Sequence, residues 1–388
     1  MIYNTLGEYL PKLESLELYL SEGFKEVAMM YGTTEMSYRK AAKLINRIRY
    51  QASATKARTL QEQTEKEGQK IAKELSKQSN EILRKYEEMP KANIEIKKEQ
   101  EQAKDKVEEN LKQIKQEYKL TDEEMEEIKS NPVEYEERKE SVEIAIDDVG
   151  VKSQKESRLK EENKIEEKGR KYHQTTVAVI KNETLSYVIS GAGQIEVLEM
   201  VIAFLIVNNL YGREKIFFVD AHRALHSNLA GSFSNQKIQI ILDWYHLEKK
   251  SSEYLSLAIK GKEQRNQILQ SLMTLLWQGR VSSAINFLNS LTQDCIKNLS
   301  YIESLITYLE RNRPNLPSYL LRQKLGLRNS SSIVEKHNDL LVASRQKHNG
   351  MSWSKDGSSA LASLTTLKLN NQVDPWFNSN FFSFKLAA

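Results

Sequence analysis

Two apolar runs that each end on an aspartate constrain the fold of this chain more than any other feature. Residues 215–219 (KIFFV) run into Asp220, and residues 237–242 (KIQIIL) run into Asp243. Runs of this length, rich in β-branched and aromatic residues, are typical of strands buried on both faces in an α/β sheet. Open α/β sheets bind their ligands at the carboxyl ends of such strands. The two aspartates therefore predict a catalytic metal site at this edge of a sheet.

The segments around these strands predict the order of the sheet. In chain order they are strands over residues 142–148, 175–180 and 186–189, a helix over residues 194–211, the strand before Asp220, a short helix and the strand before Asp243. This order is that of the ribonuclease-H-like fold, an α/β core with a mixed five-stranded sheet and flanking helices. In that fold the first strand is central and lies beside the fourth. We therefore expect Asp147 or Asp148, on the first strand, to lie close to Asp220.

Changes of pattern divide the rest of the catalytic region. Residues 141–249 hold the predicted strands and form its first part. Residues 250–325 predict several helices, and residues 326–388 predict further helices and a tail. We therefore expect an all-helical insertion over residues 250–325 that leaves the α/β core intact.

Residues 1–60 predict an α-helical, helix-turn-helix-like region that binds DNA. A short helix, a turn at residues 31–34 and a basic helix after the N-cap residue Ser37 follow one another as in this motif. The basic residues expected to contact DNA are Arg39, Lys40, Lys43 and Arg47. A pair of helices with a solvated basic face explains the pattern equally well.

Residues 61–140 differ in composition from the regions on either side. Glu, Lys and Gln dominate, Ile and Leu are sparse, and opposite charges lie three and four residues apart. Such a pattern is typical of long solvated helices. It predicts a long charged helical arm or linker, which is also a candidate oligomerisation element.

Charge and cysteine content narrow the class of protein. The 57 Lys and Arg residues nearly balance the 53 Asp and Glu residues, so the net charge of +4 does not by itself indicate a nucleic-acid partner. The single cysteine, Cys295, excludes an internal disulfide and a Cys-rich zinc site. The longest apolar stretch, residues 197–207, is too short to span a bilayer, and the N-terminus lacks the basic region of a secretory signal. These features predict a soluble cytoplasmic protein without a membrane partner.

Carboxylates at strand ends suit phosphoryl transfer on nucleic acid. Two divalent ions, about 3.5–4 Å apart, stabilise the attacking and leaving oxygens in such reactions. Mg²⁺ prefers oxygen ligands and retains some of its waters, so two or three carboxylates suffice. Asp147, Asp220 and Glu335, the last from a later helix, are the candidate ligands for two Mg²⁺ or Mn²⁺ ions.

Four segments in this order resemble bacterial insertion-sequence transposases of the DDE type. They are IDDVGVKSQK at residues 146–155, FFVDAHRALHS at residues 217–227, IILDWYHLEKK at residues 240–250, and residues 327–364, which contain EKHN and GMSWS. The resemblance covers residues 141–376, with a weaker similarity in the helix-turn-helix-like region. It implies a ribonuclease-H-like core and a metal-dependent enzyme that cuts DNA at the ends of an insertion sequence and joins those ends to a target.

The resemblance also implies roles for individual residues. Asp147 would be the first catalytic, metal-binding aspartate, although its neighbour Asp148 leaves this choice open. Asp220 and Glu335 would be the second aspartate and the catalytic glutamate, and both would bind metal. The accessory residues would be Asp148, Asp243 and His246, of which the last two form an Asp-x-x-His element beside the metal site.

The implied partners are double-stranded DNA, as element ends and target, and further copies of the chain in a homodimer or higher oligomer on DNA. The protein would then act in the bacterial cytoplasm, at the nucleoid. DNA should pass beside the site, where Lys249, Lys250, Arg345 and Lys347 are the basic residues expected to contact its backbone. The chain departs from related enzymes at Ala221, where glycine often follows the second aspartate.

Simpler explanations exist for several of these residues. Glu335 lies three residues after Ser332, which is the spacing of a capping box, and Asp220 has the position of an N-cap. Further residues with structural explanations are His246, as a core histidine bonded to Asp243, His222 and His226, on a solvated helix face rather than at a zinc site, and Trp277, Trp353 and Trp376, in the core. The alternative functions are a ribonuclease-H-like nuclease without strand transfer and a non-catalytic DNA-binding protein derived from a transposase.

Overall fold

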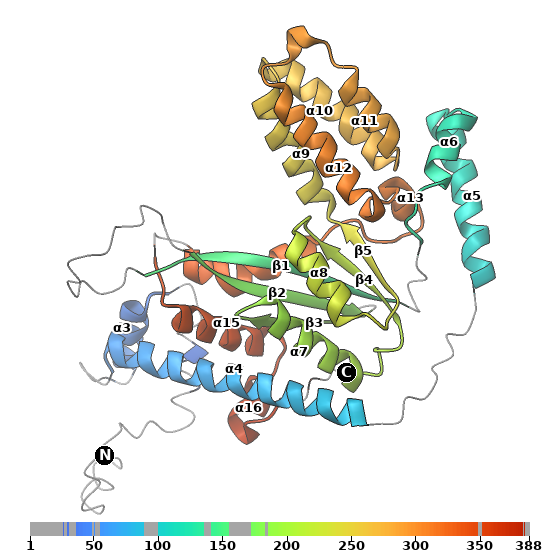
Figure 1. The fold of residues 1–388 in the computed structure, drawn as a ribbon. Coiled ribbons are helices and arrows are strands. Elements are labelled where there is room, and N and C mark those ends of the chain that lie inside the picture. Colours follow the sequence, from blue (N-terminus) through green and yellow to red (C-terminus); the bar gives the residue numbers. More distant parts are fainter. Residues whose placement is uncertain are drawn as a thin grey trace, which may run out of the picture.

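A five-stranded sheet lies at the centre of the protein (Figure 1). The computed structural model describes residues 26, 29–30, 36–48, 50, 55–88, 100–135, 141–154, 172–182, 185–347, 351–382 and 384. The strands are β1 (Ser141–Lys152), β2 (Tyr172–Asn182), β3 (Leu185–Gly191), β4 (Glu214–Val219) and β5 (Ile238–Leu242). All five lie where strands were predicted, but β1 continues past the predicted end at residue 148 to Lys152, and β2 already begins at Tyr172.

The strand β1 occupies the middle of the sheet. The order is β3-β2-β1-β4-β5, in which β1 pairs antiparallel with β2 and parallel with β4, and β4 pairs parallel with β5. Ala145 of β1 lies opposite Phe218 of β4, and Val219 lies opposite Leu242 of β5. The mixed five-stranded sheet with flanking helices is confirmed, and so is the prediction that the first and fourth strands are neighbours.

Helices cover both faces of the sheet. One face packs under α4 (Ala57–Glu88), α7 (Gln194–Val207), α8 (Arg223–Ser232) and α15 (Lys355–Leu369), and the other under α14 (Ser332–Asn338) and the π-helical segment η3 (Asp339–Lys347). Successive residues of a strand alternate between faces, so Ile144 and Ile146 pack under the first group, and Ala145 and Val149 under the second. We call these the α7 face and the α14 face.

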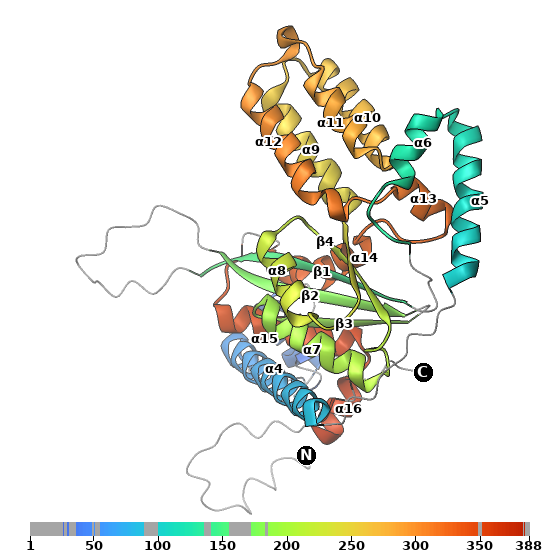
Figure 2. The same cartoon turned by 45° about the vertical axis from the view of Figure 1, so that its right-hand side comes forward.

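An all-helical block follows β5, as predicted, and rises from the carboxyl edge of the sheet (Figure 2). It contains α9 (Trp244–Ala258), α10 (Lys262–Trp277), α11 (Val281–Asn289), α12 (Leu299–Asn312) and α13 (Tyr319–Lys324), with the short 3₁₀ turns η1 (Gln293–Cys295) and η2 (Arg313–Asn315). Its first helix begins at Trp244, directly after β5, rather than near residue 250. Tyr319 fixes the block to the sheet, because its hydroxyl donates a hydrogen bond to the carbonyl oxygen of Leu242 at 2.7 Å.

The prediction of a solvated arm over residues 61–140 is wrong for α4. This helix packs along α15 and α7 and buries Ile71 and Leu75 in the core of the α7 face. At Gly68 the two helices approach so closely that a Cβ atom would lie 2.2 Å from the carbonyl oxygen of Ala360. The buried stripe of this amphipathic helix also contains Thr64 and Gly68, which are not apolar residues. The apolar pattern of the sequence was therefore too weak, among so many charged residues, to predict that α4 packs.

The second half of the same region also packs against the protein. Here α5 (Gln100–Tyr118) and α6 (Asp122–Lys129) lie against α13, with Ile114 and Met125 in one cluster with Leu320 and Leu321. Arg280 of the helical block forms an ion pair of 2.7 Å with a glutamate of α6. The described helices of residues 61–140 therefore belong to the folded body of the protein, and oligomerisation through them stays a prediction.

The basic helix predicted near the N-terminus is α3 (Tyr38–Ile48). Ser37 caps it as expected, because its hydroxyl accepts the backbone N–H of Lys40 at 3.3 Å. Most of the preceding helix and its turn lie outside the described residues, so the helix-turn-helix stays a prediction.

Two of the three tryptophans predicted as core anchors are almost fully buried. Trp353 is 7% exposed and Trp376, on the last helix α16 (Val373–Ser379), is 0% exposed. Trp277 is partly buried and stacks on Tyr319 inside the helical block. Within the described part of the chain, no helix has both the length and the apolar character needed to cross a membrane.

Candidate active site

Three aspartates lie in or directly after the neighbouring strands β1, β4 and β5. The parallel register of these strands, continued by one or two residues, brings Asp147, Asp220 and Asp243 level with one another. Ala145 and Phe218, two residues before Asp147 and Asp220, both pack on the α14 face. Because side chains alternate along a strand, Asp147 and Asp220 also lie on this face, on adjacent strands.

Asp148 lies on the opposite face and accepts a hydrogen bond there on each of its carboxylate oxygens. One of its carboxylate oxygens accepts the hydroxyl of Thr176 at 2.5 Å, and the other accepts the side-chain amide of Gln194 at 2.7 Å. Gln194 in turn accepts a hydrogen bond from Asn228 at 2.9 Å. This chain of neutral donors joins β1, β2, α7 and α8, so Asp148 has a structural role, and Asp147 is the aspartate that faces the candidate site.

The surroundings of Asp147 disfavour the ionised form of its carboxyl. Its Oδ1 accepts the backbone N–H of Asp148 at 2.8 Å, and its Oδ2 accepts the side-chain amide of Asn338 at 2.7 Å. Burial raises the pKa of the Asp147 carboxyl, and the negative charges of Asp220 and Asp148 raise it further, while the nearby His246 lowers it. A neighbouring cation favours the ionised form of a buried carboxyl that lies beside other acids.

Asp220 uses one of its two carboxylate oxygens in a local hydrogen bond. Its Oδ1 accepts the backbone N–H of His222 at 3.0 Å, and α8 begins at the next residue. The aspartate therefore stabilises the turn before the helix, but His222, not Asp220, is the N-cap residue. A ring nitrogen of His226 lies 2.8 Å from the Asp220 carbonyl oxygen. This local contact suits a structural histidine rather than half of a zinc site.

Asp243 is fully buried and connects β5 to two helices. It caps α9, because its Oδ1 accepts the backbone N–H of His246 at 2.9 Å, and its Oδ2 accepts the backbone N–H of Ser331, which precedes α14. Burial alone would raise the pKa of Asp243, but these hydrogen bonds and the His246 ring together lower it. The aspartate therefore stays ionised and fixes the start of the helix that carries Glu335.

His246 connects Asp243 to the other acids. Its Nδ1 lies 3.3 Å from Asp243 Oδ1. This contact raises the pKa of His246, and the charges of Asp147 and Asp220 raise it further against the effect of burial. Among the described residues His246 Nδ1 makes this ionic contact without a hydrogen bond, and the same ring lies within the field of the candidate catalytic aspartates.

Glu335 completes the acidic cluster from α14. The capping-box explanation does not hold, because Ser331 is the N-cap residue and Ser332 already lies inside the helix. Burial raises the pKa of the Glu335 carboxyl, and Asp243 and Asp147 raise it further, whereas His246 lowers it. Glu335 therefore lies in the same electrostatic cluster as the aspartates, although almost a hundred residues separate it from β5.

The donor chemistry of this acidic cluster suits a hard divalent cation. Asp147, Asp220 and Glu335 offer carboxylate oxygens, which Mg²⁺ and Mn²⁺ prefer. Burial and repulsion raise the pKa of Asp147 and of Glu335, and a cation would relieve both effects. No group of three or more His, Cys, Asp or Glu side chains is already gathered as a metal site in the described ranges. The three carboxylates fit the ion by their chemistry, and two of them, Asp147 and Asp220, lie level on adjacent strands.

Most of the basic residues predicted to contact DNA are exposed. These are Arg39, Lys40, Lys43 and Arg47 on α3, Lys249 and Lys250 on α9, and Lys347 at the end of η3. Lys249 also lowers the pKa of Glu335 and so lies within the field of the acidic cluster. Lys347 and Lys355 line a cleft of 640 Å³ with Tyr172 and His173 of β2. These side chains are accessible to a polyanion.

The prediction for Arg345 is wrong, because this side chain is only 3% exposed. Its guanidinium lies 4.9 Å from the ring centre of Tyr38 on α3 and 5.0 Å from that of Trp353. Cation–π contacts are stronger when the arginine is desolvated, as it is here. Arg345 therefore joins α3 to η3 and Trp353 and is not available as an exposed basic residue.

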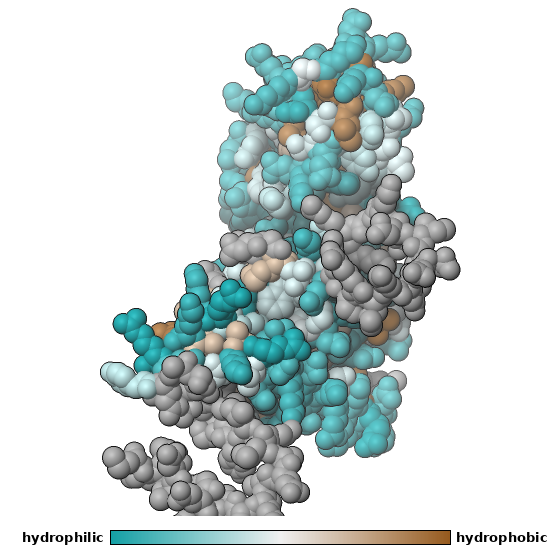
Figure 3. Space-filling view, turned by 90° about the vertical axis from the view of Figure 1, so that its left-hand side faces the viewer, coloured by the Kyte–Doolittle hydropathy of each residue, from teal (hydrophilic) through white to brown (hydrophobic). Residues whose placement is uncertain are grey.

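The surface outside the acidic cluster offers no large apolar area on the side shown in Figure 3. That side is mainly hydrophilic, and apolar side chains form small spots, chiefly toward the helical block at the top. Exposed large apolar residues of the block include Leu257 and Leu299. Isolated apolar residues of this kind are usual on protein surfaces.

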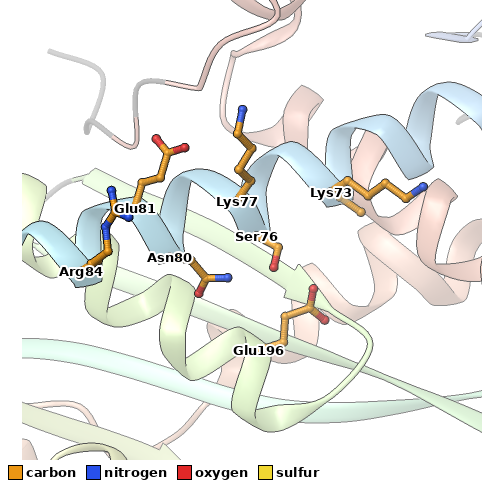
Figure 4. A pocket seen from close by; sticks show the side chains of 8 residues that line it. Lys73, Ser76, Lys77, Asn80, Glu81, Arg84 and Glu196 are labelled. Carbon is orange, nitrogen blue, oxygen red and sulfur yellow. The ribbon is translucent and has the colours of Figure 1, made fainter.

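A second cleft, on α4, was not among the predicted sites. It has a volume of 640 Å³ and is lined by Lys73, Ser76, Lys77, Asn80 and Arg84 of α4, with Glu196 of α7 opposite. Figure 4 shows Lys77 pointing away from α7, and Ser76 and Asn80 on the side nearer to Glu196. This cleft was not predictable from local sequence patterns, because it depends on the packing of α4 against α7.

No protein-family model matches this chain, and no sequence among the curated proteins matches it. What the protein does has to be inferred from the chemistry of the acidic cluster and from the residues around it.

Proposed function

We propose that this protein is a DNA transposase with a ribonuclease-H-like core, which cuts the ends of a mobile element and joins them to target DNA. Asp147, Asp220 and Glu335 are the proposed catalytic residues. The observation that supports the proposal is the sheet order β3-β2-β1-β4-β5, whose parallel β1–β4 register brings Asp147 and Asp220 level on adjacent strands, on the face opposite Asp148. The resemblance of the four sequence segments to DDE transposases supports the same function.

The chain's own residues would prepare the reaction. Asp147, Asp220 and Glu335 would hold Mg²⁺ or Mn²⁺. When bound, such ions stabilise the charge that develops on a phosphate under in-line attack and favour deprotonation of the attacking water. Asp243 holds the start of α14 and the ring of His246, so it orients two partners of the acidic cluster at once.

DNA would approach the acidic cluster along basic residues on its flanks. Lys249 lies one helical turn beyond His246, and Lys347 lines the cleft beside the end of β1 and the start of β2. The exposed basic residues of α3 would bind the element end, because α3 is joined to η3 through Arg345 and Tyr38. Contacts of this kind with phosphates position a duplex without reading its sequence.

The test is divalent-cation-dependent nicking of the DNA that flanks the gene, by the wild type and by Asp220→Asn. The substitution keeps the size of the side chain and the hydrogen bond from His222 but removes the charge. We expect nicking by the wild type only in Mg²⁺ or Mn²⁺, and a loss of more than about a hundredfold in Asp220→Asn. Equal nicking by both proteins would contradict the proposal.

A pre-cleaved element end separates the transposase from the two alternative functions. A transposase joins its 3′-hydroxyl to a second duplex, and the new product is visible as a longer strand on a denaturing gel. A nuclease of the same fold cuts the uncleaved DNA but yields no joined product. A non-catalytic DNA-binding protein yields neither product, and its DNA affinity is unaffected by Asp220→Asn.

A further inference from the structure

Asn338 is a buried polar residue at the centre of the acidic cluster. It is the last residue of α14, three residues after Glu335, and its side chain is 8% exposed. Its amide nitrogen donates a hydrogen bond of 2.7 Å to Asp147 Oδ2. The α-helix gives way to the π-helical segment η3 at the next residue. Changes of helical type of this kind occur frequently at functional sites.

The two hydrogen bonds to Asp147 fix its carboxylate. Asn338 holds one oxygen and the backbone N–H of Asp148 holds the other, so the plane of the group is set from both sides. An ionised carboxylate has about four lone-pair sites, so about two remain open to a cation. The neutral amide achieves this without adding a charge to a cluster in which Asp147 and Glu335 already have raised pKa values.

The carbonyl oxygen of the Asn338 side chain differs from the amide nitrogen in its hydrogen bonding. Its carbonyl oxygen Oδ1 is buried and has no hydrogen-bond partner among the described residues. A buried acceptor without a partner costs free energy and in native proteins usually signals an ion, a water or a functional role. An amide oxygen is also a ligand that divalent cations accept.

We infer that Asn338 is the positioning residue of the acidic cluster. Its amide nitrogen holds Asp147 in the orientation that would receive a divalent cation, and its buried carbonyl oxygen would offer such a cation a further oxygen donor. The inference rests on the proposed function in taking Asp147 as a cation ligand. Residues that orient metal ligands in this way typically change metal affinity or activity by 10- to 100-fold when replaced.

The experiment uses the full chain, without DNA, and Mn²⁺ alone as the probe. The melting temperature is followed as Mn²⁺ is added, and the half-saturating concentration is compared between the wild type and Asn338→Leu. The leucine is close in size to asparagine but donates no hydrogen bond. We expect the half-saturating concentration to rise about 10- to 100-fold. A role in packing alone changes the melting temperature without Mn²⁺ but leaves this concentration unchanged.

Asn312 provides the matched control. It is 2% exposed and its amide donates to the backbone carbonyl of Tyr308 at 2.7 Å, inside the helical block. Asn312→Leu removes a buried amide of the same kind and should leave the Mn²⁺ concentration at the wild-type value. If Asn338→Leu does not fold, Asn338→Ser takes its place, because serine keeps a donor on a shorter side chain. It should also weaken Mn²⁺ binding, since its hydroxyl lies farther from Asp147.

The outcomes separate this inference from the proposed function. A wild-type response to Mn²⁺ in the Asn338 variant overturns the inference, and so does a wild type whose melting temperature does not respond to Mn²⁺. A wild type that binds Mn²⁺ with the expected dependence on Asn338, but nicks no DNA, supports the inference and contradicts the proposed function. Nicking that survives Asp220→Asn also contradicts the proposed function alone.

Discussion

Asp147 and Asp148 are neighbours on one strand, yet they lie in opposite kinds of environment. Asp148 faces α7, where Thr176 and Gln194 supply neutral donors to both of its oxygens. Asp147 faces α14 and also accepts one hydrogen bond on each oxygen, from Asn338 and the backbone of Asp148. Its burial and the charge of Asp220 nevertheless raise its pKa, and a cation would offset both effects. The difference shows that the function of an acid in this protein depends on which face of β1 it occupies.

The largest expected effect separates these two aspartates directly. Asp147→Asn should lower divalent-cation-dependent nicking by more than about a hundredfold, because it removes a carboxylate that the cation needs. Asp148→Asn should lower it less than about tenfold and should instead destabilise the fold by about 1–3 kcal/mol, through weaker hydrogen bonds to Thr176 and Gln194. Nicking rates and urea melts of both variants measure this. The opposite ranking would assign the catalytic role to Asp148.

A second prediction concerns the packing that closes the α7 face. Gly68→Val should destabilise the protein by about 1–3 kcal/mol, because its side chain would collide with the backbone of Ala360 and separate α4 from α15. Gly231→Ala is the matched control, since this glycine lies in α8 with open space around it, and alanine should stabilise that helix by about 0.5–1 kcal/mol. Chemical denaturation measures both. Equal stability of Gly68→Val and the wild type would mean that α4 does not pack here.

A third prediction uses the pH dependence of stability without metal. The folded state raises the pKa of Asp147 above its unfolded value. The unfavourable contribution of its charge is therefore absent below the unfolded pKa, near 4, and appears as the pH rises through the folded pKa. Asp147→Asn should melt higher than the wild type at pH 7 in EDTA, and the difference should shrink at pH 4. A difference that is independent of pH would contradict the like-charge environment.

His246 gives the same experiment with the opposite sign. Its folded pKa is raised above the usual value by Asp243, Asp147 and Asp220, so its stabilising contribution is complete at acidic pH and is lost as the pH rises through the folded pKa. His246→Gln should therefore cost more stability at pH 6 than at pH 8.5. Thermal melts at the two pH values measure this, and an equal cost at both would contradict the ionic contact.

The smallest effect distinguishes a surface lysine from a buried arginine. Lys347→Ala should reduce the slope of log affinity against log salt for DNA binding by about one, as expected for one lost phosphate contact. Arg345→Gln should leave that slope unchanged and lower the melting temperature, because its cation–π contacts with Tyr38 and Trp353 are lost. Salt titrations of DNA affinity measure the slope. A changed slope in Arg345→Gln would mean that Arg345 contacts DNA phosphate after all.

The strands and the edge that carries the acids were predictable from sequence. Apolar runs fix where strands begin and end, and the order of elements placed β1 beside β4. The choice between Asp147 and Asp148 was not predictable, because a shift of one residue moves a side chain to the other face, and only the register with β2 and β4 decides it.

The remaining differences arise from contacts between distant segments. The buried stripe of α4 includes Thr64 and Gly68, so its composition did not indicate packing. The burial of Arg345 depends on Tyr38, three hundred residues earlier in the chain. Neither the hydrophobic periodicity nor the local charge pattern of a segment indicates which distant residues it will contact.

The most direct test of the central claim is a crystal of the protein soaked in Mn²⁺, with anomalous scattering used to locate the ion. We expect an anomalous peak on the α14 face, in contact with the carboxylates of Asp147 and Asp220, and no peak at Asp148. A peak beside Asp148, or an ordered crystal with no peak at Asp147 after soaking, would contradict it.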